Sequence, residues 1–200
     1  MRLDILEHGH NQKNRLALRV MRAVAGAEPD DVIKTSMYRP GFFGRPWIHL
    51  LRTVMRGESE WSPGERELFA AFTSRLNACR YCARVHVGTT ALSLDPTITV
   101  ERLEHWREAG FEPRLVATLE LLEKITLSPD RVAPDDIDQV IAAGVSEDAI
   151  VDALHVCFLF NLVNRMADAL GYDYGTEAEA LELAAILNRI GYRLPGFLLR

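Results

Sequence analysis

Cysteine is scarce in this chain of 200 residues, which contains only three. So few cysteines exclude the disulfide framework that stabilises small secreted domains. Long apolar runs are missing too: the most apolar stretch, 150–162, is interrupted by Asp152 and His155, so we expect no membrane-spanning segment. Residues 1–8 include acidic side chains where a signal peptide needs an apolar run, so we expect a cytoplasmic protein.

The chain also lacks a strong excess of charge of either sign. Lys and Arg total 23 against 28 Asp and Glu, giving a formal net charge of -5. A mildly acidic protein has no general attraction to nucleic acid or to anionic lipid, so we expect neither as a partner. The hydrophobic fraction of 48% and the charged fraction of 26% are ordinary for a globular domain with a substantial core.

Helix signals follow one another along the sequence, and no segment shows the alternation typical of hairpin strands. Ser62 to Glu65 and Thr176 to Glu179 have the pattern of capping boxes, and Ser146 can cap a long helix that Gly171 ends. The expected helices are 14–25, 46–56, 63–76, 79–92, 100–109, 113–127, 135–143, 147–170 and 177–190, with an aromatic loop at 38–46.

These elements predict a single all-α domain, a multi-helix bundle. We expect residues 1–60 to form an N-terminal helical extension packed on a core formed by residues 61–200. The aromatic side chains of Phe42, Phe43 and Trp47 are expected to make core or subunit contacts rather than to bind a cofactor.

The residues that carry chemistry are concentrated between 79 and 86. Cys79, Cys82 and His86 share one face of a helix at this spacing. Two neighbouring thiols can cycle between dithiol and disulfide, and a histidine can accept the thiol proton. A helix N-terminus near Cys79, with Arg80 and Arg84 nearby, would favour the thiolate.

A carboxylate on the preceding helix could orient this histidine, as in catalytic triads. Glu65 and Glu67 are the candidates. The capping box is expected to occupy Glu65, which leaves Glu67.

A metal site is the main alternative for the cysteine cluster. Zinc needs four ligands, of which three are local, and Glu67 or His155 would have to be the fourth. We favour redox chemistry, with neither metal nor cofactor. Cys157 is expected to be a core residue, and His155 a core histidine that could point into the site.

Polar side chains follow one face of the expected helix 147–170. Asn161, Asn164 and Asp168 lie at helical spacing and are expected to bridge neighbouring helices. Together with Tyr81 and His155, the two asparagines are candidates to surround the site without carrying the reaction.

The segment from Glu65 to His86 resembles the core of the alkylhydroperoxidase AhpD-like proteins, in the carboxymuconolactone decarboxylase superfamily. The segment from Phe160 to Gly171 resembles the peroxidase-related branch. The resemblance implies an all-helical AhpD-like bundle, homo-oligomers such as trimers or hexamers, and reduction of hydroperoxides at the expense of a dithiol reductant that the sequence does not identify.

Carried over by position, the resemblance implies that Cys82 is the peroxidatic cysteine and Cys79 the resolving one. It implies that Glu67 and His86 form a proton relay. Characterised peroxidases of the family often have a histidine between the cysteines, where this chain has Tyr81.

Two other functions stay open. One is a cofactor-free decarboxylase of small lactone acids, which has no need of a vicinal dithiol. The other is a non-catalytic protein that responds to redox state or to metal.

Overall fold

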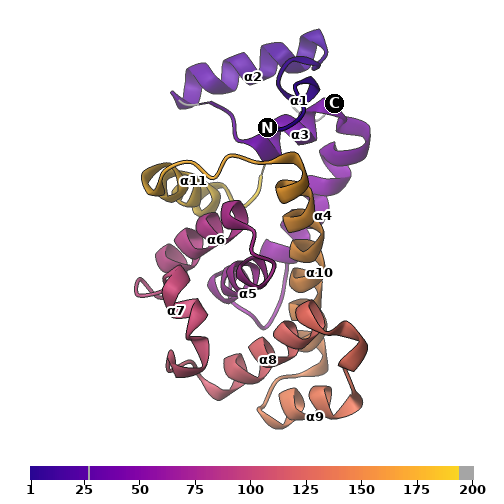
Figure 1. Ribbon diagram of the computed structural model, residues 1–200, viewed down its shortest axis with the longest axis vertical. Coiled ribbons are helices and arrows are strands. Elements are labelled where there is room, and N and C mark those ends of the chain that lie inside the picture. Colours follow the sequence, from indigo (N-terminus) through magenta and orange to yellow (C-terminus); the bar gives the residue numbers. More distant parts are fainter. Residues whose placement is uncertain (27, 194–200) are drawn as a thin grey trace.

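The computed structural model describes residues 1–26 and 28–193 (Figure 1). All their regular elements are helical, which confirms the all-α prediction. The α-helices are α1 (Ile5–His8), α2 (Gln12–Ala25), α3 (Asp31–Tyr38), α4 (Arg45–Arg56), α5 (Pro63–Leu76), α6 (Arg80–Ser93), α7 (Val100–Glu104), α8 (Pro113–Leu127), α9 (Pro134–Ala142), α10 (Glu147–Leu170) and α11 (Glu177–Ile190). Short helical segments are η1 (Pro40–Gly44), η2 (Trp106–Glu108) and η3 (Pro129–Arg131).

Helix α5 is the centre of the fold, with α6, α8 and α10 packed around it and α11 packed on α6 (Figure 1). Its residues 64–74 are all buried. The predicted capping box begins this helix: the Ser62 backbone N–H donates to Glu65 Oε2 at 2.7 Å, and the Glu65 N–H donates to Ser62 Oγ at 3.2 Å. Local capping therefore fixes where the central helix starts.

Helix α10 has 24 residues, and an 18-residue window of it has a mean hydropathy of 1.3, enough by length and composition to cross a membrane. No membrane-spanning segment was expected; core helices of globular proteins also reach this length and hydropathy, and half of the window is buried in the fold. In the fold α10 packs against α4, α5, α6 and α8 and buries ten side chains. A helix that is apolar on most sides is typical of a protein core, and α10 is such a core helix.

The N-terminal part differs from the sequence expectation in three places, the first being the short helix α1, which was not expected. Helix α3 was not expected; Asp30 caps it by accepting a hydrogen bond from the Val32 N–H at 2.9 Å. The expected loop at 38–46 is instead the π-helical segment η1, which leads into α4. The expected helix 100–109 is also split, into α7 and η2.

Figure 1 shows α1, α2 and α3 at one end of the molecule and α7, α8 and α9 at the other. Helix α4 belongs to the main hydrophobic core, to which it contributes Trp47, Ile48, Leu51 and Met55. The division of the chain at residue 60 stays a prediction.

Close approach of α11 to α6 depends on one glycine. A Cβ atom on Gly88 would lie 3.0 Å from the Cβ of Ala184. Asn188 also donates its side-chain amide to the Thr89 carbonyl oxygen at 3.1 Å. These contacts hold the C-terminal helix against the helix that carries the cysteines.

Candidate active site

A tight turn between α5 and α6 places the first cysteine. Ala78 has a φ of 56°, which is uncommon for a residue other than glycine. The Cys79 N–H donates to the Ser74 carbonyl oxygen at 3.0 Å, and Cys79 is the N-cap residue of α6. The predicted break at Asn77 and Ala78 is confirmed, and it presents Cys79 at the positive end of the helix dipole.

Both thiols are almost completely buried, with exposed fractions of 0% for Cys79 and 1% for Cys82. All three cysteines of the chain are free. The hydrogen bond with Cys79, followed by burial, raises the pKa of Cys82 well above its ordinary value. The expectation of a stabilised thiolate is therefore wrong for Cys82, whose thiol holds its proton in the reduced site.

The arginines next to the cysteines do not oppose this effect. Arg80 and Arg84 both place their guanidinium groups over the ring of Tyr174, and Arg84 donates to the Gly175 carbonyl oxygen at 2.7 Å. Their guanidinium groups therefore contact the loop between α10 and α11 instead of the thiols.

His86 lies one turn after Cys82 on the same face of α6, as the spacing predicts. Its Nδ1 lies 2.6 Å from Glu67 Oε2, and its ring packs edge-on against Phe160 at 4.5 Å. With Nδ1 donating to a carboxylate, Nε2 is the nitrogen that can accept a proton. The contact with Glu67 fixes both the tautomer and the orientation of the ring.

Glu67 has an exposed fraction of 0% and accepts hydrogen bonds from four side chains. Besides His86, the donors are Arg56 Nη2 at 2.6 Å, Thr89 Oγ1 at 2.8 Å and the Tyr192 hydroxyl at 2.9 Å. The Arg56 guanidinium also lies 4.9 Å from the centre of the Tyr192 ring. The carboxylate is thus held from α4, α6 and the residues after α11.

This environment keeps Glu67 ionised. Burial alone would raise the pKa of Glu67, but the hydrogen bond and charge of His86, the charge of Arg56 and the hydrogen bond from Thr89 outweigh it and lower the pKa to about 2. At neutral pH Glu67 is therefore a fixed anion, suited to holding His86 in place.

A cavity of about 110 Å³ reaches Cys82 and His86. Its other lining side chains are mostly apolar and come from α3, α4, α10 and α11: Val32, Ile33, Trp47, Ile48, Leu51, Phe160, Val163, Leu183, Leu187 and Ile190. Cys79 is not among the residues that line it. A small molecule in this cavity would meet the Cys82 side of the dithiol.

Tyr81, between the cysteines, also lines this cavity. Its hydroxyl donates a short hydrogen bond to Asp30, and its ring packs edge-on against Tyr172 at 5.3 Å. Burial, together with the charge of Asp30, raises the pKa of Tyr81 well above its ordinary value. Tyr81 is therefore not a base at neutral pH; it ties α6 to the start of α3.

The asparagines of α10 bridge helices, as predicted. Asn164 is fully buried, accepts from the Asn77 amide at 3.0 Å and donates to Ser74 Oγ at 3.0 Å. Asn161 accepts from Asn77 at 3.1 Å and donates to Thr126 Oγ1 at 3.3 Å. Both side chains hold the turn before Cys79 against α10.

Cys157 is a core residue, as predicted. His155 is exposed, so the expectation of a core histidine is wrong, and His155 does not line the cavity. The residue sits on the face of α10 turned away from α5. Among the described residues, no group of three or more His, Cys, Asp or Glu side chains is arranged to hold a metal ion.

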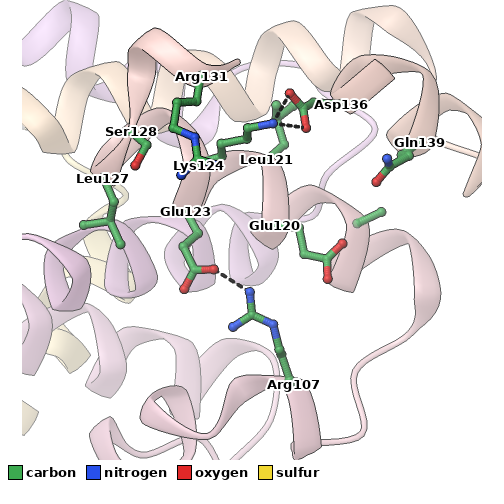
Figure 2. Close-up of a pocket in the computed structure, with 11 residues that line it drawn as sticks. Arg107, Glu120, Leu121, Glu123, Lys124, Leu127, Ser128, Arg131, Asp136 and Gln139 are labelled. Atoms are coloured by element: carbon green, nitrogen blue, oxygen red, sulfur yellow. Dashed lines mark hydrogen bonds and ion pairs between the residues drawn. The ribbon is translucent and has the colours of Figure 1, made fainter. Parts of the chain in front are cut away.

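A second, larger cavity of about 390 Å³ opens between α8, α9 and η2 (Figure 2). Four of its six charged side chains form two ion pairs: Arg107 Nη2 lies 2.5 Å from Glu123, and Lys124 Nζ lies 2.6 Å from Asp136. Figure 2 shows both pairs within the cavity wall. Among the described residues, no thiol or histidine lines this larger cavity, so the smaller cavity at Cys82 is the candidate active site.

No protein-family model matches the sequence. YdfG, an uncharacterized protein of Bacillus subtilis (strain 168), is 30% identical over 107 residues, which cover 53% of this chain and 73% of YdfG.

Two solved structures, both of proteins described as uncharacterized and peroxidase-related, superpose on most of the chain. The protein from Silicibacter sp. TM1040 has a TM-score of 0.73 at 24% identity and covers 86% of this chain and 90% of its own. The protein from Ralstonia eutropha JMP134, described as an alkylhydroperoxidase AhpD core, has a TM-score of 0.74 at 22% identity. The match covers 92% of this chain and 95% of the Ralstonia chain. The chain therefore belongs to the family of YdfG and has the fold of the AhpD-like, peroxidase-related proteins.

Proposed function

We propose that this protein is a thiol-dependent oxidoreductase that reduces hydroperoxides through a Cys79/Cys82 dithiol–disulfide cycle. The observation that carries the proposal is the cavity, which reaches Cys82 and His86 but not Cys79. Cys82 is thus the thiol open to a substrate, and Cys79 is the buried partner that contacts it. The peroxidatic and resolving roles follow from this difference in access.

The reaction begins with proton transfer. His86 Nε2 takes the proton of the Cys82 thiol, and Glu67 stabilises the imidazolium that forms. The Cys82 thiolate attacks the terminal oxygen of a hydroperoxide R–O–O–H, so that an S–O bond forms and the O–O bond breaks. The leaving R–O⁻ takes the proton from His86 and departs as R–OH, and Cys82 becomes a sulfenic acid.

Cys79 closes the cycle. Its thiol attacks the Cys82 sulfur, the disulfide forms, and the hydroxyl group leaves as water with the Cys79 proton. A dithiol reductant then returns the disulfide to two thiols and is itself oxidised. We propose the cytoplasm as the compartment, because a disulfide that must be reduced in every cycle needs a reducing environment.

The cavity favours an organic hydroperoxide with an apolar group R. Apolar side chains form most of its wall, so they exclude water and stabilise a hydrocarbon group. A lactone acid substrate of the decarboxylase alternative would need a cation for its carboxylate. Among the described residues, the cavity wall contains no lysine or arginine, and the nearby Arg56 is paired with Glu67.

Cysteine variants test the proposal. Treated with tert-butyl hydroperoxide, wild type is expected to form the Cys79–Cys82 disulfide with one peroxide consumed per dithiol. Cys79→Ser should accumulate sulfenic acid on Cys82, because no resolving thiol is left, and Cys82→Ser should lose peroxide consumption. Cys157→Ser is the matched control and should behave as wild type. Mass spectrometry that places the sulfenic acid on Cys79, or peroxide consumption retained in Cys82→Ser, would contradict the assignment.

A further inference from the structure

We propose that the indole N–H of Trp47 is the hydrogen-bond donor that holds the oxygen of an apolar substrate inside the Cys82 cavity. The inference rests on the proposed function for the identity of that oxygen, which is the leaving oxygen of a hydroperoxide. It adds a residue of α4, far from the cysteine motif in sequence, to the substrate site.

Trp47 lines the cavity and is 94% buried, with an exposed fraction of 6%. Its Nε1 has no hydrogen-bond partner among the described residues. Trp61 gives the contrast within the same chain, since its Nε1 donates to the Ala149 carbonyl oxygen at 2.7 Å. Buried polar groups of native proteins are nearly always paired, so an unpaired donor in a cavity wall calls for a ligand acceptor.

The other polar groups of the cavity wall are already engaged. The Tyr81 hydroxyl donates to Asp30, and Asp30 also accepts from the Val32 N–H. The Tyr192 hydroxyl donates to Glu67, as does His86 Nδ1. Among the described side chains of this wall, Trp47 therefore has a neutral donor without a partner, whereas His86 Nε2 accepts the thiol proton and passes it to the leaving oxygen.

The Trp47 ring is also held in one orientation. It packs edge-on against Phe43, with ring centres 5.6 Å apart and an angle of 70° between the planes. A rigid donor can recognise one oxygen of a substrate without losing conformational freedom on binding. A donor at the leaving oxygen is worth most in the transition state, where the O–O bond breaks and negative charge develops there.

The first test measures the donor directly and needs no reaction. Tert-butanol, the product from tert-butyl hydroperoxide, is added to reduced wild-type protein labelled with ¹⁵N, and the indole N–H signals of the three tryptophans are followed. We expect the Trp47 proton signal to move downfield in a saturable manner, while Trp61 stays unchanged. Saturating tert-butanol without a change at Trp47 would overturn the proposal.

The second test measures the rate. In a Cys79→Ser background, Trp47→Phe keeps an aromatic ring but removes the donor. We expect the rate constant of Cys82 with tert-butyl hydroperoxide to fall roughly 10- to 100-fold, the range for a hydrogen bond to an oxygen that gains charge. Alkylation of Cys82 by iodoethane, which offers no acceptor oxygen, should keep its rate.

These outcomes separate the two proposals. If wild type does not react with peroxide but its Trp47 signal still responds to tert-butanol, the proposed oxidoreductase activity is refuted and the proposed donor site is retained. If Trp47→Phe slows the peroxide and iodoethane reactions equally, the substitution has damaged the site and the proposed role of Trp47 is overturned. An unchanged rate with peroxide would also overturn that role. If Trp47→Phe does not fold, the titration of wild type still decides.

Discussion

Glu67→Gln is the substitution that probes the site most deeply, because this carboxylate is buried among four donors. Its pKa falls from an ordinary 4.5 to about 2 in the folded protein. Each pKa unit corresponds to about 1.4 kcal/mol, so the charged form of Glu67 stabilises the fold by about 3 kcal/mol at neutral pH. Gln cannot supply this charge, and Arg56 loses its buried partner.

The sign of the pH dependence follows from the lowered pKa. A carboxyl group whose pKa is lower in the folded state stabilises the protein above its unfolded pKa and loses this contribution as pH falls through the folded pKa. The stability difference between wild type and Glu67→Gln should therefore shrink from about 3 kcal/mol at pH 7 to about half of that at pH 3 and should approach zero below pH 2.

Urea denaturation of both proteins between pH 7 and pH 3 measures this difference. Glu120→Gln, at an exposed position of α8, is the control for loss of one negative charge and should differ little from wild type at any pH. A difference between wild type and Glu67→Gln that does not change with pH would refute the reasoning. If Glu67→Gln does not fold, the Glu67 carboxyl group of wild type can be titrated by NMR instead. A titration midpoint near pH 4.5 would also refute the reasoning.

Three further predictions concern His86, Tyr81 and the exposed face of α10. His86→Ala should slow oxidation of Cys82 by tert-butyl hydroperoxide about 10²- to 10⁴-fold in stopped-flow measurements, because the proton acceptor is lost. An unchanged rate would contradict the proposed catalytic role of the dithiol and His86. Tyr81→Phe should lose about 1–3 kcal/mol of unfolding free energy, because the buried partner of Asp30 is removed, while the oxidation rate changes only a few-fold. We also propose that the protein is a homo-oligomer whose subunits contact each other through the outer face of α10, where Phe158 is 63% exposed. Phe158→Asp should lower the sedimentation coefficient to that of a monomer. A wild-type protein that is monomeric at micromolar concentration would contradict this proposal.

Helix boundaries could be read from the sequence wherever a local signal fixes them. Helix α10 begins after Ser146 and ends before Gly171, as predicted, because capping side chains and a left-handed glycine act within a few residues. Helix α3 was missed although Asp30 caps it, since eight residues show too little periodicity. The split of 100–109 at His105 depends on packing of Trp106 in the core, which no local pattern reveals.

The candidate site was predictable only where its residues are close in sequence. Cys79, Cys82, His86 and Glu67 lie on two consecutive helices, so spacing and one turn bring them together. Thr89, one turn after His86, could have been found from the same spacing.

The other hydrogen-bond partners of Glu67 come from parts of the chain that only the tertiary structure brings close to it. Tyr192 lies 125 residues from Glu67 in sequence, and Arg56 reaches it from the preceding helix. The expected direction of the Cys82 pKa shift was also wrong. Its largest cause is the hydrogen bond with Cys79 and its second is burial, to which distant segments that line the cavity contribute. The guanidinium groups of Arg80 and Arg84, which the sequence places near the thiols, lie over the ring of Tyr174 instead.

The raised pKa of Cys82 and the lowered pKa of Glu67 together define how such a site can work. A carboxyl group with a pKa of about 2 does not carry a proton at neutral pH, so Glu67 orients His86 and stabilises its charge rather than passing the proton on. In the proposed mechanism, proton transfer from the Cys82 thiol to an unprotonated His86 would create an ion pair without changing the net charge of the buried site. Burial of that pair is costly unless its charges are compensated, and Glu67 compensates the imidazolium. In the proposed mechanism the thiol is reactive only while Glu67 holds His86, and Glu67 is in turn held by Arg56 of α4 and by Tyr192, which lies after α11.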